Sequence, residues 1–551
     1  ILPSRGGEEG LFLTEERKWL NRQGLNLAPD SERKLFSESY LIYIALTRAG
    51  RGLRLSASRA DNEGKSLAPS PLFYSLSRLF PGIKIQEGPE PEERTLCRPR
   101  PALRQLALAM QKADAEEKEA RLWPWLYQWF SRRPEFAPEL SAVTRGWALE
   151  PLGRQLPADL AERLFGRIIK TSITRLEQFQ ACPFAHFLAY GLKLSPRQEY
   201  EVRPPEIGNF FHDSLEALLK ESREKDRELS SLSEEQLDLW VDLVVEKQLA
   251  EKSHEIFLTS AWYRTLSLRL SRILHSAARA MAFQEGQGRF RPLAMEAAFG
   301  MDRPDSLAPL RLDLGGGREI LLRGRIDRID RFCPQEGGAE YLRIVDYKSG
   351  FQDLQLWQVY YGLKLQLVLY LEAARASRRD SRPAGMFYFQ MKDPVVKAAN
   401  SLVLAPGGRE ELARQGLKEQ KLRGYLLRDK EIAAAMDRDF GKSLFLPVSL
   451  LQSGEFSSRS NLCSAEEFRL LGDYSRSLLR QAGKRLMAGD IRLSPYKAGR
   501  KESACTYCDY RAVCRFDPSI SGHRYRNLLM EKDTEIWPLM RKEVDSGEKL
   551  E

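Results

Sequence analysis

The stretch Tyr341-Leu-Arg-Ile-Val-Asp-Tyr-Lys-Ser-Gly350 decides the fold of this 551-residue chain. Leu342, Ile344, Asp346 and Lys348 share one face of the β-strand that we expect here, and Arg343, Val345 and Tyr347 share the other. Because successive side chains of a strand point to opposite faces, Asp346 and Lys348 emerge side by side at its end. A carboxylate in that position can hold a divalent metal, and an ammonium two residues on can orient or polarise a water. The stretch therefore carries the minimal equipment for metal-assisted phosphodiester hydrolysis.

The flanking sequence predicts the elements around this strand. Residues 320–330 read as a preceding strand, and the turn-rich residues 334–338 connect the two as a hairpin. Asp327 would then supply a second carboxylate from the neighbouring strand. Downstream, residues 354–374 predict a helix on which Gln366 and Tyr370 lie one turn apart.

Asp327, Asp346-Tyr-Lys348 and Gln366-x-x-x-Tyr370 follow one another in an order that resembles the PD-(D/E)XK nuclease superfamily, specifically its RecB-like branch. The resemblance implies an α/β nuclease domain with a central mixed sheet flanked by helices. A surface hairpin with ordinary charged residues is the alternative, and the number of pieces found in order disfavours it.

Composition places the chain among globular proteins with a polyanionic partner. Its length allows three or four domains, and the hydrophobic fraction of 42% supports sizeable cores. The net charge of +10 and the isoelectric point near 9.1 fit DNA as that partner. No apolar run reaches membrane-spanning length and no signal peptide is visible, so we expect a cytoplasmic protein without membrane contact. The first residue, Ile1, leads us to expect the C-terminal part of a longer polypeptide.

Residues 1–60 contain Tyr43-Ile-Ala-Leu-Thr-Arg-Ala49, which resembles the last motif of UvrD-like superfamily 1 helicases. That resemblance implies a 2A-type helicase remnant closed by a strand at 53–57. It also implies that Arg48 reaches a nucleotide γ-phosphate. A short amphipathic helix with one basic residue is the alternative.

No phosphate-binding Walker loop accompanies this motif. The Gly-Lys-Ser triplets at 64–66 and 441–443 lack the glycine required five residues earlier, where Arg59 and Met436 stand. We therefore expect no ATPase activity from this chain alone. Residues 61–165 predict a connecting region of helices and loops with no assigned chemistry.

The nuclease module is expected to begin with a helix capped by Thr174, with Glu177 three residues later as its capping-box partner. His212 lies on a second helix, at 207–219, and the RecB-like resemblance implies that it faces the metal. Glu296, in an expected strand at 295–299, is either a further metal ligand or a solvated strand residue.

Four cysteines suggest a second metal site. Cys505, Cys508 and Cys514 form a C-x2-C-x5-C cluster, and Cys182 precedes a proline, a pairing common at iron–sulfur centres. Four thiolates suffice for a [4Fe–4S] cluster or an all-cysteine zinc site. Such a site would tie the first helix of the module to its last segment. The remaining cysteines are interpreted as ordinary thiols.

The order of these features resembles the C-terminal half of the AddB family, the B subunits of bacterial AddAB helicase–nucleases. The resemblance implies a heterodimer with an AddA-like helicase–nuclease subunit and a [4Fe–4S] cluster on the four cysteines. It also implies Chi-regulated processing of double-strand DNA ends for recombination, with this subunit's exonuclease cutting the 5′-terminated strand. The expected domains are a helicase-like part, a connecting region, the nuclease domain with its cysteine clasp, and a charged tail, at 1–60, 61–165, 166–520 and 521–551.

We assign the site residues as a hypothesis. Mg²⁺, a hard ion that prefers oxygen ligands, would be held by Asp327, Asp346, His212 and the backbone carbonyl of Tyr347. The water-positioning and groove-lining residues are Lys348, Gln366 and Tyr370. Two other functions stay open: a free-standing RecB-like nuclease of the CRISPR-associated type, and a non-catalytic DNA-binding scaffold subunit.

Overall fold

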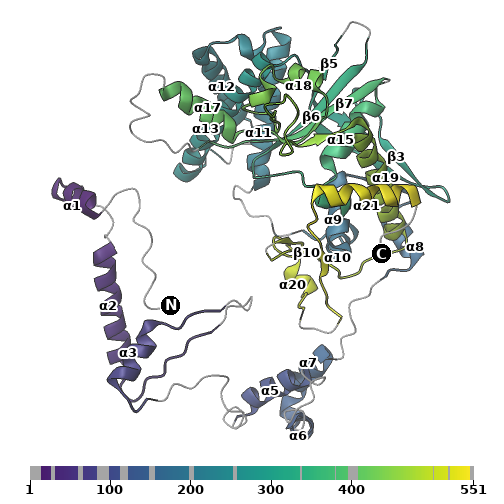
Figure 1. Ribbon diagram of the computed structural model, residues 1–551. Coiled ribbons are helices and arrows are strands. Elements are labelled where there is room, and N and C mark those ends of the chain that lie inside the picture. The colour runs from purple at the N-terminus through teal and green to yellow at the C-terminus, as the bar shows by residue number, and fades with distance from the viewer. Residues whose placement is uncertain are drawn as a thin grey trace. The chain divides into compact units, whose positions relative to one another are not determined.

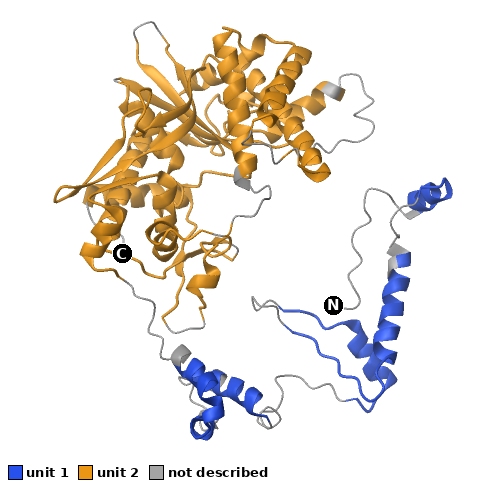
Figure 2. Cartoon of the chain, turned by 180° about the vertical axis from the view of Figure 1, so that it is seen from behind, with its two compact units in different colours: residues 1–147 blue, residues 148–551 orange. Residues whose placement is uncertain are grey.

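A computed structural model gives the structure of this chain. It describes residues 14–25, 31–59, 66–83, 98–111, 122–147, 155–195, 197, 204–251, 257, 259–334, 338–378, 380–394, 408–500, 502–518 and 522–546. Most of the first Gly-Lys-Ser triplet and Cys97 therefore lie outside the described residues. The chain divides into two compact units, residues 1–147 and 148–551 (Figure 2). The expected boundaries near 60 and 520 fall inside these units.

The first unit is helical where it is described. Its helices are α1 (Thr14–Arg22), α2 (Ser31–Thr47), α3 (Pro71–Leu79), α5 (Pro99–Gln111), α6 (Leu122–Ser131) and α7 (Ala137–Trp147). Leu106 and Phe130 are fully buried in a small core formed by α5, α6 and α7. The strand expected at 53–57 is wrong: this segment is irregular and exposed. No described strand lies beside it, and a lone extended segment has no partner for its backbone N–H and C=O groups.

The second unit is built on a six-stranded mixed sheet (Figure 1). In spatial order its strands are β2 (Arg291–Phe299), β5 (Gly324–Phe332), β6 (Glu340–Lys348), β7 (Ser381–Gln390), β8 (Arg423–Leu427) and β9 (Leu462–Cys463). β5 is antiparallel to both of its neighbours, β2 and β6, whereas β7 runs parallel to β6. The α/β prediction with a central mixed sheet is confirmed, and so is the hairpin of β5 with β6.

A smaller sheet corrects one sequence prediction. The single strand expected at 320–330 is two strands, because β4 (Arg318–Leu322) pairs with β1 (Ile168–Thr171) and β3 (Leu310–Gly315), while β5 pairs in the large sheet. The chain changes sheets at Arg323 and Gly324. A Cβ atom on Gly324 would lie 2.7 Å from the ring of Phe299, so a side chain would obstruct the crossing.

Thirteen α-helices are described in the second unit, and several of them pack on the sheet. They are α8 (Ala158–Phe165), α9 (Ile173–Ala181), α10 (Pro183–His186), α11 (Pro204–Glu224), α12 (Glu234–Leu249), α13 (Ala261–Gln287), α14 (Leu356–Tyr360), α15 (Gln366–Ala376), α17 (Gly408–Glu419), α18 (Lys430–Met436), α19 (Ala465–Met487), α20 (Arg511–Cys514) and α21 (Asp533–Ser546). α15 packs on β6 and β7, and α11 reaches β2. The two helices that carry predicted site residues thus flank the strands that carry the others.

Two helix predictions need correction. The helix expected at 354–374 is broken into α14 and α15, since Gly362 adopts a left-handed conformation (φ +72°) that ends the first helix. The N-cap of α9 is Ser172, whose side chain accepts from the N–H of Arg175; Thr174 lies inside the helix. Glu177 is therefore not a capping-box partner, and its carboxylate binds elsewhere.

The C-terminal segment packs into the second unit. A three-stranded sheet of β10 (Tyr496–Ala498), β11 (Glu502–Ser503) and β12 (Arg526–Leu528) precedes α21. α21 lies beside α19 and buries Ile536 and Met540 completely, so the expected charged tail contributes to the core (Figure 1). Among the described residues, no helix has the length and apolar character needed to cross a membrane.

Candidate active site

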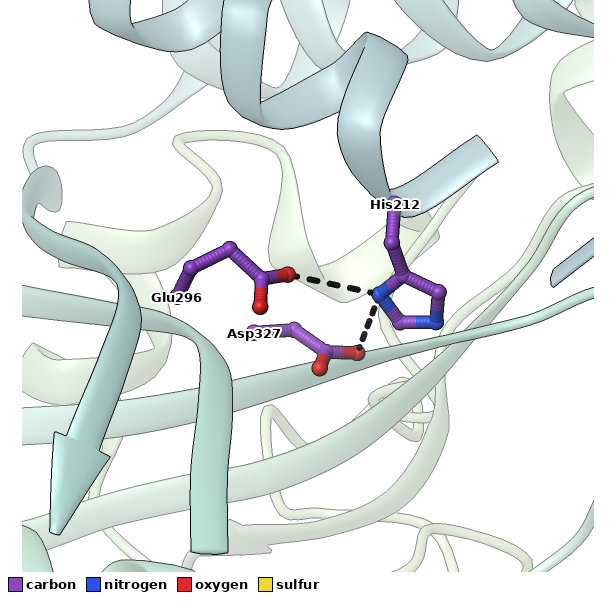
Figure 3. Close-up of side chains that lie close together, drawn as sticks. All are labelled: His212, Glu296 and Asp327. Atoms are coloured by element: carbon purple, nitrogen blue, oxygen red, sulfur yellow. Dashed lines mark ion pairs between the residues drawn. The ribbon is translucent and has the colours of Figure 1, made fainter. Parts of the chain in front are cut away.

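Three side chains of types that can bind a metal ion, from three different elements, lie close together. Nδ1 of His212, on α11, lies 3.4 Å from Oε1 of Glu296 on β2 and 3.5 Å from Oδ2 of Asp327 on β5 (Figure 3). Among the described residues, these three alone bring His, Cys, Asp or Glu ligand atoms within 4.8 Å of one another as a group. Their donor set, two carboxylates and an imidazole, fits a divalent cation.

Glu296 reaches the centre through an unusual backbone conformation. Its neighbours Met295 and Ala297 pair with Arg328 and Ile326, which places Glu296 opposite Asp327. Its φ of +46° lies in the left-handed region, which is uncommon and costly for a residue with a Cβ atom. Such conformations persist where the surrounding structure enforces them. The sequence left the role of Glu296 open because the regular alternation of side chains along a strand does not reveal a left-handed residue.

Asp346 and Lys348 stand next to this group, at the end of β6. Nζ of Lys348 lies 2.7 Å from Oδ2 of Asp346. The Asp346 side chain is 1% exposed, and its Oδ1 has no hydrogen-bond donor among the described residues. A buried carboxylate oxygen without a donor is costly unless a cation balances it. This oxygen is the feature of the site that fits a metal most directly.

The carboxyl groups repel one another. Burial, then the nearby charge of Asp346, raises the pKa of Asp327 well above its usual value. Burial also raises the pKa of Asp346, although the Lys348 ammonium opposes the shift. Burial alone would lower the pKa of His212, but its bond to Glu296 and the charge of Asp327 raise it overall. Concentrated negative charge in a buried place is the electrostatic signature of a cation site.

A chain of hydrogen bonds leads away from Lys348. Its Nζ donates to Oε1 of Gln366 at 3.1 Å, and Nε2 of Gln366 donates to the hydroxyl of Tyr370 at 2.9 Å. The structure thus brings together Gln366 and Tyr370, predicted at helical spacing, with the lysine. Tyr347 places its N–H 2.7 Å from Oδ2 of Asp327 and buries its ring against Phe389.

The four predicted cysteine ligands line one cavity in the C-terminal region. Cys182 ends α9, Cys514 ends α20, and Cys505 and Cys508 lie between β11 and α20; all four face the cavity together with apolar side chains such as Leu188. Burial raises the pKa of Cys182 to about 11 and raises those of Cys505 and Cys508. Thiols in such surroundings become thiolates when a cation binds them.

The spacing of these sulfurs bears on the metal. A tetrahedral zinc site with Zn–S bonds of about 2.3 Å would hold its sulfurs about 3.8 Å apart. Within the described part of the chain, no three cysteine sulfurs lie within 4.8 Å of one another. The four cysteines therefore line one cavity without forming a tight tetrahedral group in this structure.

Arg48 belongs to the first unit. It follows α2 directly, and its side chain is exposed. The structure brings no predicted site residue to it within that unit.

Comparisons with known proteins agree with these observations. The family described as the PD-(D/E)XK nuclease superfamily matches residues 170–515, and the ATP-dependent helicase/deoxyribonuclease AddB fifth domain matches residues 89–146. Proteins named as B subunits of an ATP-dependent helicase/deoxyribonuclease are similar along the chain. The one from Desulforamulus reducens is 37% identical across 100% of this chain and 48% of its own length. Those from Thermoanaerobacter sp. and Desulfitobacterium hafniense are 35% and 36% identical across 100% and 98% of this chain, and 48% and 46% of their own lengths. The chain thus spans about half the length of the curated relatives it matches.

Proposed function

Because the chain belongs to the PD-(D/E)XK nuclease superfamily and to its AddB family, we propose that it is the nuclease part of a helicase–nuclease and cleaves DNA with the help of Mg²⁺. One observation carries the proposal: Oδ1 of Asp346 has no donor within the part of the chain that the structure describes, and it lies beside Lys348 and the cluster of His212, Glu296 and Asp327. The positive net charge supports a polyanionic substrate.

The residues that fit the metal are Asp327 and Asp346, with His212, Glu296 and the backbone carbonyl of Tyr347 completing the set. When bound, Mg²⁺ polarises a phosphoryl oxygen and lowers the pKa of a coordinated water. Carboxylate-rich surroundings suit this hard ion. Including Glu296 extends the set expected from the sequence by one carboxylate.

The other residues position the reactants. The Lys348 ammonium stands beside Asp346, where it orients the attacking water and stabilises the negative charge that grows on the phosphate. Gln366 holds that ammonium through its amide oxygen, and Tyr370 holds the amide. A lysine fixed from two sides has less freedom to lose when the reaction begins.

The wider assignment rests on the relatives, whose printed name joins a helicase to a deoxyribonuclease. We propose that the chain acts at double-strand DNA ends as an exonuclease on the 5′-terminated strand, in a heterodimer with an AddA-like subunit. Arg48 is proposed to contact nucleotide only with the help of a phosphate loop outside this chain. We propose a [4Fe–4S] cluster on Cys182, Cys505, Cys508 and Cys514, which their presence around one apolar cavity supports.

Digestion of end-labelled duplex and single-stranded DNA with Mg²⁺ tests the proposal. We expect the 551-residue chain to shorten labelled DNA, and to do so faster with an AddA-like subunit. The Asp346→Asn variant should bind DNA but not cleave it. Asp473→Asn, which changes a half-exposed aspartate on α19, is the control. Binding without cleavage in the unaltered protein would instead favour the scaffold alternative. Full nuclease activity of the chain alone, unchanged when the AddA-like subunit is added, would favour a free-standing nuclease.

A further inference from the structure

Glu177 connects α9 to the first turn of α15. Its Oε1 accepts hydrogen bonds from the backbone N–H groups of Leu365 at 2.6 Å and Gln366 at 3.2 Å, although the chain separates them by 188 and 189 residues. The first N–H groups of a helix have no partner within the helix itself. α15 begins at Gln366, and the side chain of its own N-cap, Leu365, is apolar and makes no capping bond. Glu177 therefore does for α15 what a local cap residue does elsewhere.

The helix that Glu177 caps carries the relay to the candidate centre. The backbone N–H of Gln366 donates to Glu177, and the side-chain Oε1 of Gln366 accepts from Nζ of Lys348. A shift of the first turn of α15 would move the amide oxygen that holds the ammonium. Burial raises the pKa of Glu177 overall, while the nearby positive charges of Lys364 and Lys348 favour its charged form. Nζ of Lys364 also donates to Oε1 of Gln352 at 2.8 Å.

We propose that Glu177 is a positioning residue of the nuclease centre, which fixes the first turn of α15 and, through Gln366, the ammonium of Lys348. The inference rests on the proposed function for its effect on cleavage. The placement of Lys348 by Glu177 can be measured whether or not the chain cleaves DNA.

α9 is well placed for this role because its other end is anchored. The helix ends at Cys182 in the cysteine cavity, and the backbone oxygen of Gln180 accepts from the guanidinium of Arg526 on β12. Oε1 of Gln180 lies 3.4 Å from Nη1 of Arg485, on α19. Glu177 thus projects from a helix that is held on two sides.

Glu285 offers a matched control. Glu285 is a buried glutamate, whereas Glu177 is half-buried, but its carboxylate likewise accepts a distant backbone N–H, that of Ser230 at 2.9 Å. That bond fixes a turn that carries no predicted site residue. Replacing either glutamate by alanine removes an acceptor for distant backbone N–H groups, two at Glu177 and one at Glu285, so both variants report the general effect of such a loss on stability. Glu177→Gln keeps an oxygen acceptor without the charge and serves if Glu177→Ala does not fold.

The test measures position first and activity second. In the 551-residue chain, Glu177→Ala should speed deuterium exchange at the amides of Leu365 and Gln366. It should also change the acetylation rate of Lys348 relative to Lys392, which pairs with Glu419 outside the centre. Glu285→Ala should change neither. On DNA, Glu177→Ala should lower kcat about 100-fold with KM nearly constant, as expected for a misplaced catalytic group, and Glu177→Gln should fall between.

The outcomes separate the two proposals. Unchanged exchange and unchanged Lys348 labelling in Glu177→Ala and Glu177→Gln would overturn the positioning role. An equal loss of activity in Glu285→Ala would overturn it as well. Altered exchange and labelling in a chain that never cleaves DNA would support the positioning role while overturning the proposed function.

Discussion

The carboxylate of Asp327 and the backbone N–H of Tyr347 are joined by a hydrogen bond of 2.7 Å across 20 residues of chain. The bond crosses from β5 to β6, outside the regular ladder of the hairpin. It uses one lone pair of Oδ2 and orients the carboxyl group toward His212, whose Nδ1 lies 3.5 Å away. Asp327 is thus fixed by the backbone of the strand that carries Asp346.

Asp346→Asn should abolish metal-dependent stabilisation along with cleavage. With free Mg²⁺ at about 100 times its Kd, binding to the folded state alone stabilises a protein by about 2.7 kcal/mol. Titration of Mg²⁺ during thermal unfolding at pH 8 should raise the Tm of the unaltered protein and leave that of Asp346→Asn nearly constant. Equal Mg²⁺ responses in the two proteins would show that Asp346 is not a ligand.

The same carboxyl groups predict how stability without metal depends on pH. Their pKa values are raised in the folded state, so they favour folding below their ordinary pKa near 4. That contribution is lost as pH rises through the raised values. In the presence of a chelator, the free energy of unfolding of the unaltered protein should therefore fall as pH rises from weakly acidic to alkaline values. The fall should be larger than in the Asp346→Asn variant. Identical slopes in the two proteins would contradict this.

Gln366→Ala should reduce cleavage without unfolding the domain. The substitution removes the acceptor for Lys348 and the donor to Tyr370, so the ammonium is less well held. We expect kcat to fall by roughly 10- to 100-fold. Gln287→Ala is the matched control, since Gln287 accepts from Arg438 at 2.6 Å at an exposed position. Steady-state digestion of labelled DNA measures both, and a similar loss in the two variants would argue against a specific role.

Asp330→Asn should destabilise the nuclease fold strongly. Asp330 is fully buried and binds Arg328 at 2.6 Å and Arg343 at 2.7 Å, both of which are also buried. Removing its charge leaves two guanidinium groups in the core without a counter-charge, which costs about 3–5 kcal/mol. Arg378→Ala breaks a partly exposed pair with Glu340 and should cost less than about 1 kcal/mol. Urea unfolding of the two variants compares them directly.

Cys508→Ser should remove a chromophore. Protein purified without oxygen is expected to be brown, with the absorbance near ~400 nm of an iron–sulfur thiolate centre. Cys333→Ser changes an exposed cysteine that lies away from the cavity and should keep the colour. Colourless protein containing stoichiometric zinc would reject the cluster and favour an all-cysteine zinc site.

His186 predicts a loss of stability in weak acid. The rings of Phe165, Phe179 and Tyr190 contact it, and burial lowers its pKa to about 4. As pH falls below an ordinary histidine pKa near 6.5, this histidine takes up a proton in the unfolded chain before it does so in the folded protein. The contribution of His186 to the free energy of unfolding is therefore complete above pH 6.5 and is lost as pH falls toward 4. The loss attributable to His186 is about 3 kcal/mol. Subtracting the profile of His186→Phe isolates it; parallel profiles would contradict the assignment.

The strand and hairpin predictions succeeded where the local residue pattern agreed with the pairing of the strands in the folded sheet. β6 lies between β5 and β7 in the middle of the sheet, where its apolar residues Leu342, Ile344 and Val345 are buried. Prediction failed where the chain changes direction. The strand at 320–330 crosses between two sheets at Gly324, and the helix at 354–374 breaks at Gly362, because hydrophobic periodicity does not show which partner a segment pairs with.

The sequence by itself identified the candidate groups, because the order of Asp327, Asp346 and Lys348, with Gln366 and Tyr370 at helical spacing, predicts the site residues and the elements that bear them. Only the tertiary structure decided that Glu296 turns into the centre and that Glu177 caps α15, because both depend on contacts between segments distant in the chain. Spacing along a chain fixes which faces residues share within one element. It does not fix which distant backbone groups those residues meet.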